Sequence, residues 1–230
     1  MKRGGRKPLG RVKIKWSSNF AYAIGLIATD GCLSKDGRHV VFVSKDLEQI
    51  ENYQRTLGIS CSIGRKSRGG ESERKYFVLQ FGDVLFYKFL LSVGLTPAKS
   101  KIIGELEIPD EYFFDFLRGH LDGDGTFYSY WDPRWHSSFM FYTVFLSASK
   151  KHIDWISSKL YQFLEIKGHI VNNNDLIYSL KFAKNESLKL LPKLYYSDKI
   201  IYLSRKYNKI QKALHIENKH NNESKNARVL

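Results

Sequence analysis

Two short, mostly apolar runs in the chain share one pattern of glycine and acid. Residues 23–31 read AIGLIATDG and residues 117–125 read LRGHLDGDG, so that Gly25 matches Gly119 and Asp30 matches Asp124. Each run has the character of a helix, and a glycine inside a helix costs about 1 kcal/mol relative to alanine. The usual reason for such a glycine is close approach of another backbone. The pattern therefore predicts two helices in near contact, with the two aspartates brought together at their C-terminal ends.

The stretches after the two runs alternate between strand-like and helix-like patterns in the same order. In the first half we predict a helix from Ser17 or Ser18 to about Thr29, a hairpin turning at Asp36 and Gly37, a helix over 47–57, strands over 62–67 and 76–81, and a helix over 84–93. In the second half we predict a helix from Asp110 or Glu111, strands over 127–131 and 139–146, a helix over 153–163, strands over 168–171 and 176–182, and a helix over 187–194.

This repeated order predicts an α+β protein made of two αββαββα halves related by a pseudo-twofold axis. The halves span residues 17–109 and 110–216, and their antiparallel, saddle-shaped sheets should flank the two central helices. Residues 1–16 are basic and contain Pro8 and several glycines, which predicts a flexible arm. Residues 217–230 are polar and poor in aromatic residues, which predicts a disordered tail.

The net charge narrows the class of partner. The chain has 37 Lys and Arg against 23 Asp and Glu, a net charge of +14, which suits a polyphosphate and fits a glycosidase poorly. No apolar run reaches the roughly 18 residues that span a membrane, and no secretory signal peptide is visible. Two cysteines provide neither a disulfide framework nor a zinc site. We therefore expect an intracellular protein that associates with DNA, in a compartment the sequence does not specify.

The two aspartates have a chemical consequence of their own. A carboxylate is disfavoured at a helix C-terminus by the helix dipole, and two adjacent carboxylates repel each other. Such a pair is suited to a hard cation bound through oxygen ligands. The alternative is that each Asp-Gly pair only ends its helix in a turn.

The two runs resemble the paired motifs of the LAGLIDADG homing endonucleases, in the single-chain form that carries both copies. The second copy has both motif acids, Asp122 and Asp124, whereas the first has Ala28 at the earlier position and keeps Asp30 at the later one. The resemblance implies that Asp30 and Asp124, with the carbonyl groups of Thr29 and Gly123, hold catalytic Mg²⁺. Mn²⁺ or Ca²⁺ could replace it for binding.

The same resemblance implies four catalytic lysines. Lys99 and Lys206 match the active-site lysines of the family, while Lys45 and Lys150, each after a serine at the end of a hairpin strand, match positions that orient water. Contact with phosphate without a catalytic role is the alternative for Lys45 and Lys150. Neighbouring basic residues that could substitute are Lys101 and Arg205.

The predicted strands also carry candidate DNA contacts, because a two-stranded β-ribbon fits the major groove. The candidates are Arg38, Arg65, Lys66, Arg68, Arg74 and Lys75 in the first half and Tyr128, Tyr130, Arg134, Trp135 and Lys181 in the second. For each of them the alternative is an ordinary solvated surface side chain.

By resemblance, the chain is a monomeric homing endonuclease that acts in intron homing. It would hydrolyse both strands of double-stranded DNA at a long, asymmetric site and leave 3′ cohesive ends. Two alternatives remain open on the same fold: a maturase that binds intron RNA, and a catalytically inactive DNA-binding regulator.

Overall fold

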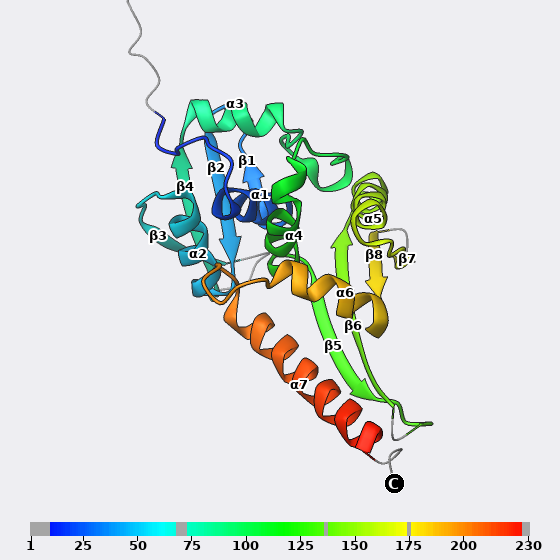
Figure 1. Cartoon of the computed structure of the whole chain (residues 1–230). Helices are drawn as coiled ribbons and strands as arrows, with labels where there is room; N and C mark the ends of the chain where they lie inside the picture. The colour runs from blue at the N-terminus through cyan, green and yellow to red at the C-terminus, as the bar shows by residue number, and fades with distance from the viewer. Residues whose placement is uncertain (1–9, 68–72, 136–137, 174–175, 227–230) are drawn as a thin grey trace, which may run out of the picture.

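The computed structural model describes residues 10–67, 73–135, 138–173 and 176–226, which form two halves with the same order of elements (Figure 1). The first half contains α1 (Ser18–Asp30), β1 (Gly31–Leu33), β2 (His39–Ser44), α2 (Leu47–Leu57), β3 (Ile63–Lys66), β4 (Tyr76–Gly82) and α3 (Val84–Ser92). The second contains α4 (Phe113–Asp122), β5 (Thr126–Trp131), β6 (Phe139–Ser147), α5 (Lys150–Leu164), β7 (His169–Asn173), β8 (Ile177–Phe182) and α6 (Lys184–Leu194), and α7 (Ser204–Asn226) follows. Two short 3₁₀ helices, η1 (Lys99–Lys101) and η2 (Asp110–Tyr112), lie between the halves.

Each half folds around one four-stranded antiparallel sheet. The strand orders are β1-β2-β4-β3 and β5-β6-β8-β7, so the second sheet repeats the topology of the first. In β2, Val40 and Phe42 are fully buried, while Val41 and Val43 point to the other, partly open face. The predicted α+β fold with two αββαββα halves is confirmed, and α1 and α4 lie between the two sheets (Figure 1).

The contact between α1 and α4 is made by their backbones at the two motif glycines. A Cβ atom added at Gly25 would lie 2.1 Å from the carbonyl oxygen of Phe116, and one added at Gly119 would lie 2.1 Å from that of Tyr22. Both distances are far below van der Waals contact, and the neighbouring atoms are backbone that cannot move aside. The predicted close approach at these glycines is therefore confirmed.

Strand register shows which residues of the two halves are equivalent. Val41 lies opposite Cys32 in the β1–β2 pair, and Val144 lies opposite Thr126 in the β5–β6 pair. Because Cys32 and Thr126 each follow the last glycine of their motif, Val41 is equivalent to Val144. Three residues further on, Ser44 is equivalent to Ser147, and each accepts a hydrogen bond from the amide two residues later, at 3.0 and 3.1 Å.

The N-terminal segment differs from the predicted flexible arm over residues 10–16. The carboxylate of Asp83, which caps α3, also accepts hydrogen bonds from the amides of Arg11 and Val12 at 2.5 and 2.9 Å. Val12 is buried, and the Trp16 ring packs edge-on against Phe20 at 5.6 Å between centroids. This part of the arm is therefore docked on the first half, and the rest lies outside the described residues.

Helix α7 differs from the expected disordered tail, because it continues to Asn226. Glu217 is buried and pairs with Lys184 at 3.1 Å, and the His220 ring lies 5.8 Å from that of Trp131 at the end of β5. The helix runs beside the β5–β6 hairpin in Figure 1. Its polar composition concealed it in the sequence, since only a narrow face is buried.

The remaining differences concern element boundaries. Helix α4 begins at Phe113 after a 3₁₀ turn, α5 begins at Lys150, and α6 begins at Lys184, so the last two start three residues before their predicted first residues.

Within the described ranges, no helix is both long and apolar enough to cross a membrane.

Replacing Gly25 with alanine tests the backbone contact between the motif helices. Gly25→Ala should lower the free energy of unfolding by about 3 kcal/mol or more, since the new methyl group forces the two backbones apart. Urea unfolding monitored by circular dichroism measures this change. Gly104→Ala is the control, because nothing lies within 4 Å of a Cβ at Gly104. Equal stability of the two variants would contradict the packing described here.

Candidate active site at the ends of the motif helices

Asp30 and Asp124 meet where α1 and α4 end. Asp30 is the last residue of α1, and Asp124 is the second residue after α4. A Cβ atom added at Gly123 would lie 3.2 Å from Oδ2 of Asp30 and 2.0 Å from Oγ1 of Thr29. Gly123 therefore allows the end of α1 to pass directly against the chain that leads to Asp124.

The environment of the two carboxyl groups disfavours their charge. Burial, followed by the charge of Asp124, raises the pKa of Asp30 to about 7. Burial also raises the pKa of Asp124, even though its side chain reaches the surface. Lys99 and Lys206 act in the opposite direction and lower both pKa values. Because both pKa values remain raised, the two lysines only partly offset the cost of charging the carboxyl groups, and a further cation would stabilise the ionised pair.

The oxygen atoms of the pair are poorly satisfied by the protein. The amide of Gln49 donates to Oδ2 of Asp30 at a long 3.4 Å, and within the described residues the Asp124 carboxylate has no hydrogen-bond or ion-pair partner. Two repelling carboxylates with unused lone pairs fit a divalent cation. Among the described residues no group of three or more His, Cys, Asp or Glu side chains could hold a metal. The remaining ligands would be carbonyl oxygens, water and substrate phosphate, as Mg²⁺ prefers.

Lys99 and Lys206 occupy equivalent places beside the two motifs. The Lys99 ammonium donates to the carbonyl of Gly31, and the Lys206 ammonium donates to the carbonyl of Gly125 at 2.7 Å. Gly31 and Gly125 are the matching last glycines of the motifs. Further acceptors of Lys206 are the carbonyls of Leu121, Asp122 and Gly123 at 2.6, 2.8 and 3.0 Å.

Burial of these two ammonium groups lowers both pKa values, that of Lys206 to about 8. The neighbouring basic candidates lie differently. Arg205 pairs with Asp46 at 2.7 Å, and Lys101 is exposed. Lys99 and Lys206 thus contact the motif backbone next to the aspartates, whereas Arg205 lines the pocket at Asp30 while paired with Asp46.

Lys45 and Lys150 are not equivalent, which corrects the expectation from the sequence. Lys45 is the residue after Ser44, so its equivalent after Ser147 is Ala148. Lys150 lies in the first turn of α5, where it pairs with Asp154 at 2.7 Å and is exposed. Both lysines follow a serine, but Lys150 follows the cap of a helix and Lys45 follows the last residue of a strand. Because both lysines stand in the same Ser-Lys dipeptide, the sequence did not reveal this shift of two residues.

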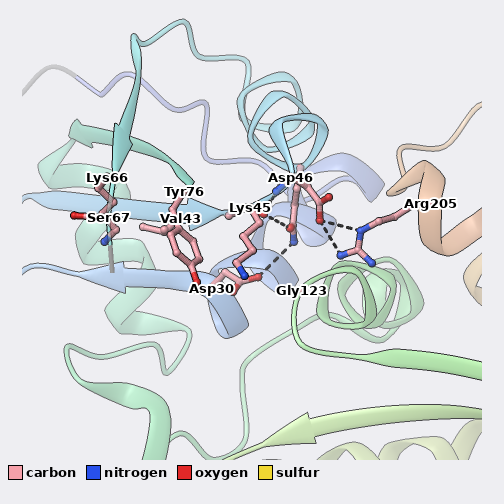
Figure 2. A pocket seen from close by; sticks show the side chains of 11 residues that line it. Asp30, Val43, Lys45, Asp46, Lys66, Ser67, Tyr76, Gly123 and Arg205 are labelled. Atoms are coloured by element: carbon pink, nitrogen blue, oxygen red, sulfur yellow. Dashed lines mark hydrogen bonds and ion pairs between the residues drawn. The ribbon is translucent and has the colours of Figure 1, made fainter. Parts of the chain in front are cut away.

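Two pockets of unequal size open beside the aspartates. The pocket at Asp30 has a volume of about 710 Å³ and includes Lys45, Lys66, Tyr76 and Arg205 in its lining. Figure 2 shows the Lys45 side chain pointing into this pocket toward Asp30.

The pocket at Asp124 has a volume of about 190 Å³, and none of the described residues that line it is lysine or arginine. The lining residue His120 is buried, and its pKa is well below the ordinary value because of burial and the neighbouring His152. The ring centroids of the two histidines are 5.2 Å apart, and burial also lowers the pKa of His152 to about 4. Both rings are therefore neutral near pH 7.

The earlier motif acid, Asp122, has a structural environment. Its side chain is fully buried and accepts hydrogen bonds from the Tyr22 hydroxyl at 2.7 Å and the Leu203 amide at 2.8 Å. It thereby ties α4 to α1 and to the segment that leads into α7. No role was predicted for Asp122 from the sequence. A usable signal was the apolar Ala28 at the matching position of the first motif.

A second buried polar pair on α4 holds the same C-terminal segment. Arg118 is fully buried, pairs with Asp115 at 2.7 Å, and donates to the carbonyls of Leu194 and Ile201 at 3.1 and 2.9 Å. This pair was not predicted. The backbone around residues 194–203 is thereby fixed, and the position of Lys206 depends on it.

The candidate DNA contacts of the first half lie on different faces. Lys66 is exposed and lies opposite Tyr76, on the open face of the sheet. Arg65 points to the other face, where its guanidinium stacks on Phe77 at 4.5 Å from the ring centroid. Exposed residues beside the strands are Arg38 in the β1–β2 turn and Arg74 and Lys75 before β4. Arg68 lies outside the described residues.

The candidate DNA contacts of the second half lie on the open face of its sheet and at the end of the β5–β6 hairpin. Tyr128 and Tyr130 stack with Tyr142 on the open face, with centroids 5.2 and 6.4 Å from it, and Lys181 lies opposite Val144 on the same face. At the end of the hairpin, Arg134 pairs with Asp132 at 3.2 Å and Trp135 is 70% exposed.

Comparison with known proteins agrees with this geometry. A family model described as a LAGLIDADG-like domain matches residues 17–94. The meganuclease I-AabMI bound to uncleaved DNA is 13% identical, with a TM-score of 0.61 over 89% of this chain and 92% of that one. I-SmaMI bound to an uncleaved DNA target in the presence of calcium ions is also 13% identical, with a TM-score of 0.58 over 89% and 93%.

Full-length WhiA from Thermatoga maritima is 16% identical, with a TM-score of 0.53 over 92% of this chain and 70% of that one. No curated protein sequence matches the chain. Packed motif helices that end in paired carboxylates, between two such sheets, define the LAGLIDADG class of fold. The chain has this fold, and the LAGLIDADG-like family model matches within its first half.

The different roles of the acids can be separated by stability measurements in metal-free buffer. Asp30→Asn should raise the free energy of unfolding at pH 8 by about 1 kcal/mol or more, because it removes a carboxylate whose ionised form the folded state disfavours. The gain should shrink as the pH falls below about 7 and disappear only below about pH 3, where the carboxyl group is protonated in both states. Asp122→Ala should instead lower stability by about 2 kcal/mol, since two buried donors lose their acceptor. Loss of stability in Asp30→Asn at pH 8 would contradict the charge balance inferred above.

Proposed function

We propose that the chain is a metal-dependent, site-specific endonuclease that cuts both strands of double-stranded DNA. The observation that carries this proposal is the pair Asp30 and Asp124, each beside a lysine that contacts the last glycine of its own motif. One acid from each half provides one site for each strand. A single chain would therefore suffice for double-strand cleavage.

The chemistry proposed is hydrolysis of a phosphodiester bond. The oxygen of a water molecule bonds to phosphorus, the bond from phosphorus to the 3′ oxygen breaks, and one water proton ends on that oxygen. The products are a 3′ hydroxyl and a 5′ phosphate. Mg²⁺ held by Asp30 and Asp124 would supply Lewis acidity and lower the pKa of bound water.

The protein residues contribute position and charge to this reaction. Asp30 and Asp124 would hold the cation on oxygen ligands, with the Thr29 and Gly123 carbonyls as further candidates; the latter also accepts from Lys206 at 3.0 Å. The buried ammonium groups of Lys99 and Lys206 would stabilise the negative charge that develops at the phosphate.

The open faces of the two sheets are the proposed DNA interface. A net charge of +14 favours association with a polyanion, and the open faces carry Lys66, Tyr128, Tyr130 and Lys181. Structures with this fold include DNA-bound meganucleases. The two faces carry different side chains, so we infer an asymmetric target of two unlike half-sites.

Two other functions are compatible with the same fold. The N-terminal domain of WhiA, whose description names a LAGLIDADG domain and no nuclease, is similar over 80% of this chain and 85% of that one. This likeness favours a DNA-binding protein without cleavage as the second candidate. An intron RNA maturase would use the same basic surface on RNA. Retention of both Asp30 and Asp124 favours the endonuclease.

Cleavage of a randomised duplex-DNA library in Mg²⁺ tests the proposal. The unmodified protein should linearise library members at one long site and leave 3′ cohesive ends. Asp30→Asn and Asp124→Asn should each lose double-strand cleavage by about 10²-fold or more while they bind the recovered site with similar affinity. Tight binding without any cleavage in Mg²⁺ or Mn²⁺ would reject the endonuclease and favour the regulator or the maturase.

A tyrosine substitution tests the proposed interface. Tyr130→Ala should weaken binding to the recovered site by about 1 kcal/mol, roughly fivefold in Kd, because it removes one contact from the open face of the second sheet. Tyr161→Ala is the matched control, since Tyr161 is 52% exposed but lies on α5. Fluorescence anisotropy with labelled duplex measures both. An equal loss in the two variants would place the interface elsewhere.

A further inference from the structure

We infer that the DNA target extends further from the cleaved bonds on the side of the second half of the chain than on the side of the first. This inference rests on the proposed function and adds to it an unequal length of the two half-sites. The surface assigned to the extra length is the outer part of the β5–β6 hairpin, residues 128–135 and 138–142, which we call the ribbon.

The two hairpins that lead away from the motif helices differ in length. Cys32 and Thr126 are equivalent, because each follows the last glycine of its motif. The first hairpin closes with a 2.9 Å hydrogen bond donated by the amide of Ser34, two residues after Cys32. The second closes with a 2.9 Å hydrogen bond donated by the amide of Asp132, six residues after Thr126. The difference of four residues lengthens the second hairpin by about 14 Å.

The extra length of the second hairpin is not paired with the rest of its sheet. Strand β2 pairs with β4 along its whole length, whereas β6 pairs with β8 only over residues 143–147. In the part of the chain that the structure describes, residues 139–142 therefore pair with β5 alone. The hairpin projects beyond its sheet with two strands (Figure 1), and a two-stranded hairpin of this kind fits the major groove of B-DNA.

Helix α7 supports the back of the ribbon, on the face opposite the stacked tyrosines. Lys184 donates to the carbonyl of Phe139 at 2.9 Å and pairs with the buried Glu217 of α7 at 3.1 Å. The His220 ring of α7 lies 5.8 Å from the Trp131 ring, and that ring lies 5.0 Å from the Phe139 ring. Because a two-stranded hairpin alone is only marginally stable in water, these contacts fix the direction in which the ribbon projects.

The free surface of the ribbon carries groups suited to a nucleic acid. The rings of Tyr128, Tyr130 and Tyr142 stack with one another, which holds the three phenol groups in fixed positions. At the end of the ribbon, Trp135 is 70% exposed and the Arg134 side chain is 81% exposed. This surface is continuous with the open face of the sheet. The occupant we assign to it is therefore the outer end of one half-site of the duplex.

Trimmed duplexes measure the length of each half-site. The starting duplex carries the site recovered from the library by binding selection, and base pairs are removed from one end at a time. Fluorescence anisotropy in Ca²⁺ gives the Kd. Affinity should depend on about four more base pairs on one side of the cleaved bonds than on the other, since the ribbon adds about 14 Å. Removal of those outer base pairs should raise the Kd by about tenfold.

A substitution at the end of the ribbon identifies the side that is longer. Trp135→Ala should raise the Kd of the full duplex by about fivefold or more and leave that of the shortened duplex unchanged, because both changes remove the same contact. Arg38→Ala is the matched control, since Arg38 is an exposed residue in the turn of the first hairpin. It should weaken binding to both duplexes by the same factor.

The support from α7 is tested through the ring that it places against the ribbon. His220→Ala should raise the Kd of the full duplex by about threefold, as expected for the loss of one ring contact, and leave that of the shortened duplex unchanged. His220→Phe keeps a ring against Trp131 and should restore binding. Equal weakening of both duplexes by His220→Ala would show that His220 only stabilises the fold and does not position the ribbon.

The outcomes separate this inference from the proposed function. Half-sites of equal length, or an equal loss on both duplexes from Trp135→Ala, would overturn the unequal length and leave the endonuclease intact. If trimming the longer side cancels the effect of Arg38→Ala instead, the assignment to the ribbon is wrong. Absence of sequence-specific DNA binding would overturn the proposed function and this inference together. Binding without cleavage would overturn the endonuclease alone, because the Trp135 comparison needs no cut.

Discussion

The contact on which the rest of the structure depends is the one between the backbones of α1 and α4. Gly25 and Gly119 let the helices approach until a single methyl group would collide with a carbonyl oxygen. This approach brings the ends of the helices together, and with them Asp30 and Asp124. The repulsion between two partly buried carboxylates is thus imposed by packing, and positive charge nearby is needed to stabilise their ionised forms. The ammonium groups of Lys99 and Lys206 provide part of that charge.

Much of the fold and the centre of the site could be predicted because they follow from local rules. Glycines inside two apolar runs specify a close contact, and alternating patterns specify strands. The position of Lys45 relative to Lys150 could not be predicted, since both follow a serine and only strand register separates them. Helix α7 was also missed, because its few buried residues, such as Ile210 and Ala213, are diluted by a polar surface.

The polar cluster on α4 could not be foreseen for another reason. Asp115, Arg118 and Asp122 read as surface residues in a sequence, since such side chains are seldom fully buried unless they are paired. Besides each other and the Tyr22 hydroxyl, their partners lie in residues 194–203, mostly backbone groups far along the chain that have no distinctive sequence. Interactions of side chains with remote backbone leave no pattern that a single sequence reveals.

That cluster also limits how the two halves can be recombined. At the positions of Asp115, Arg118 and Asp122, the first motif helix has Ala21, Ile24 and Ala28. A chimaera built from two copies of the first half would keep the glycine contact and a pair of motif aspartates but would have no anchor for the C-terminal segment. The two halves are therefore not interchangeable, and a recombined protein would have to keep α4 in place while the sheets are exchanged.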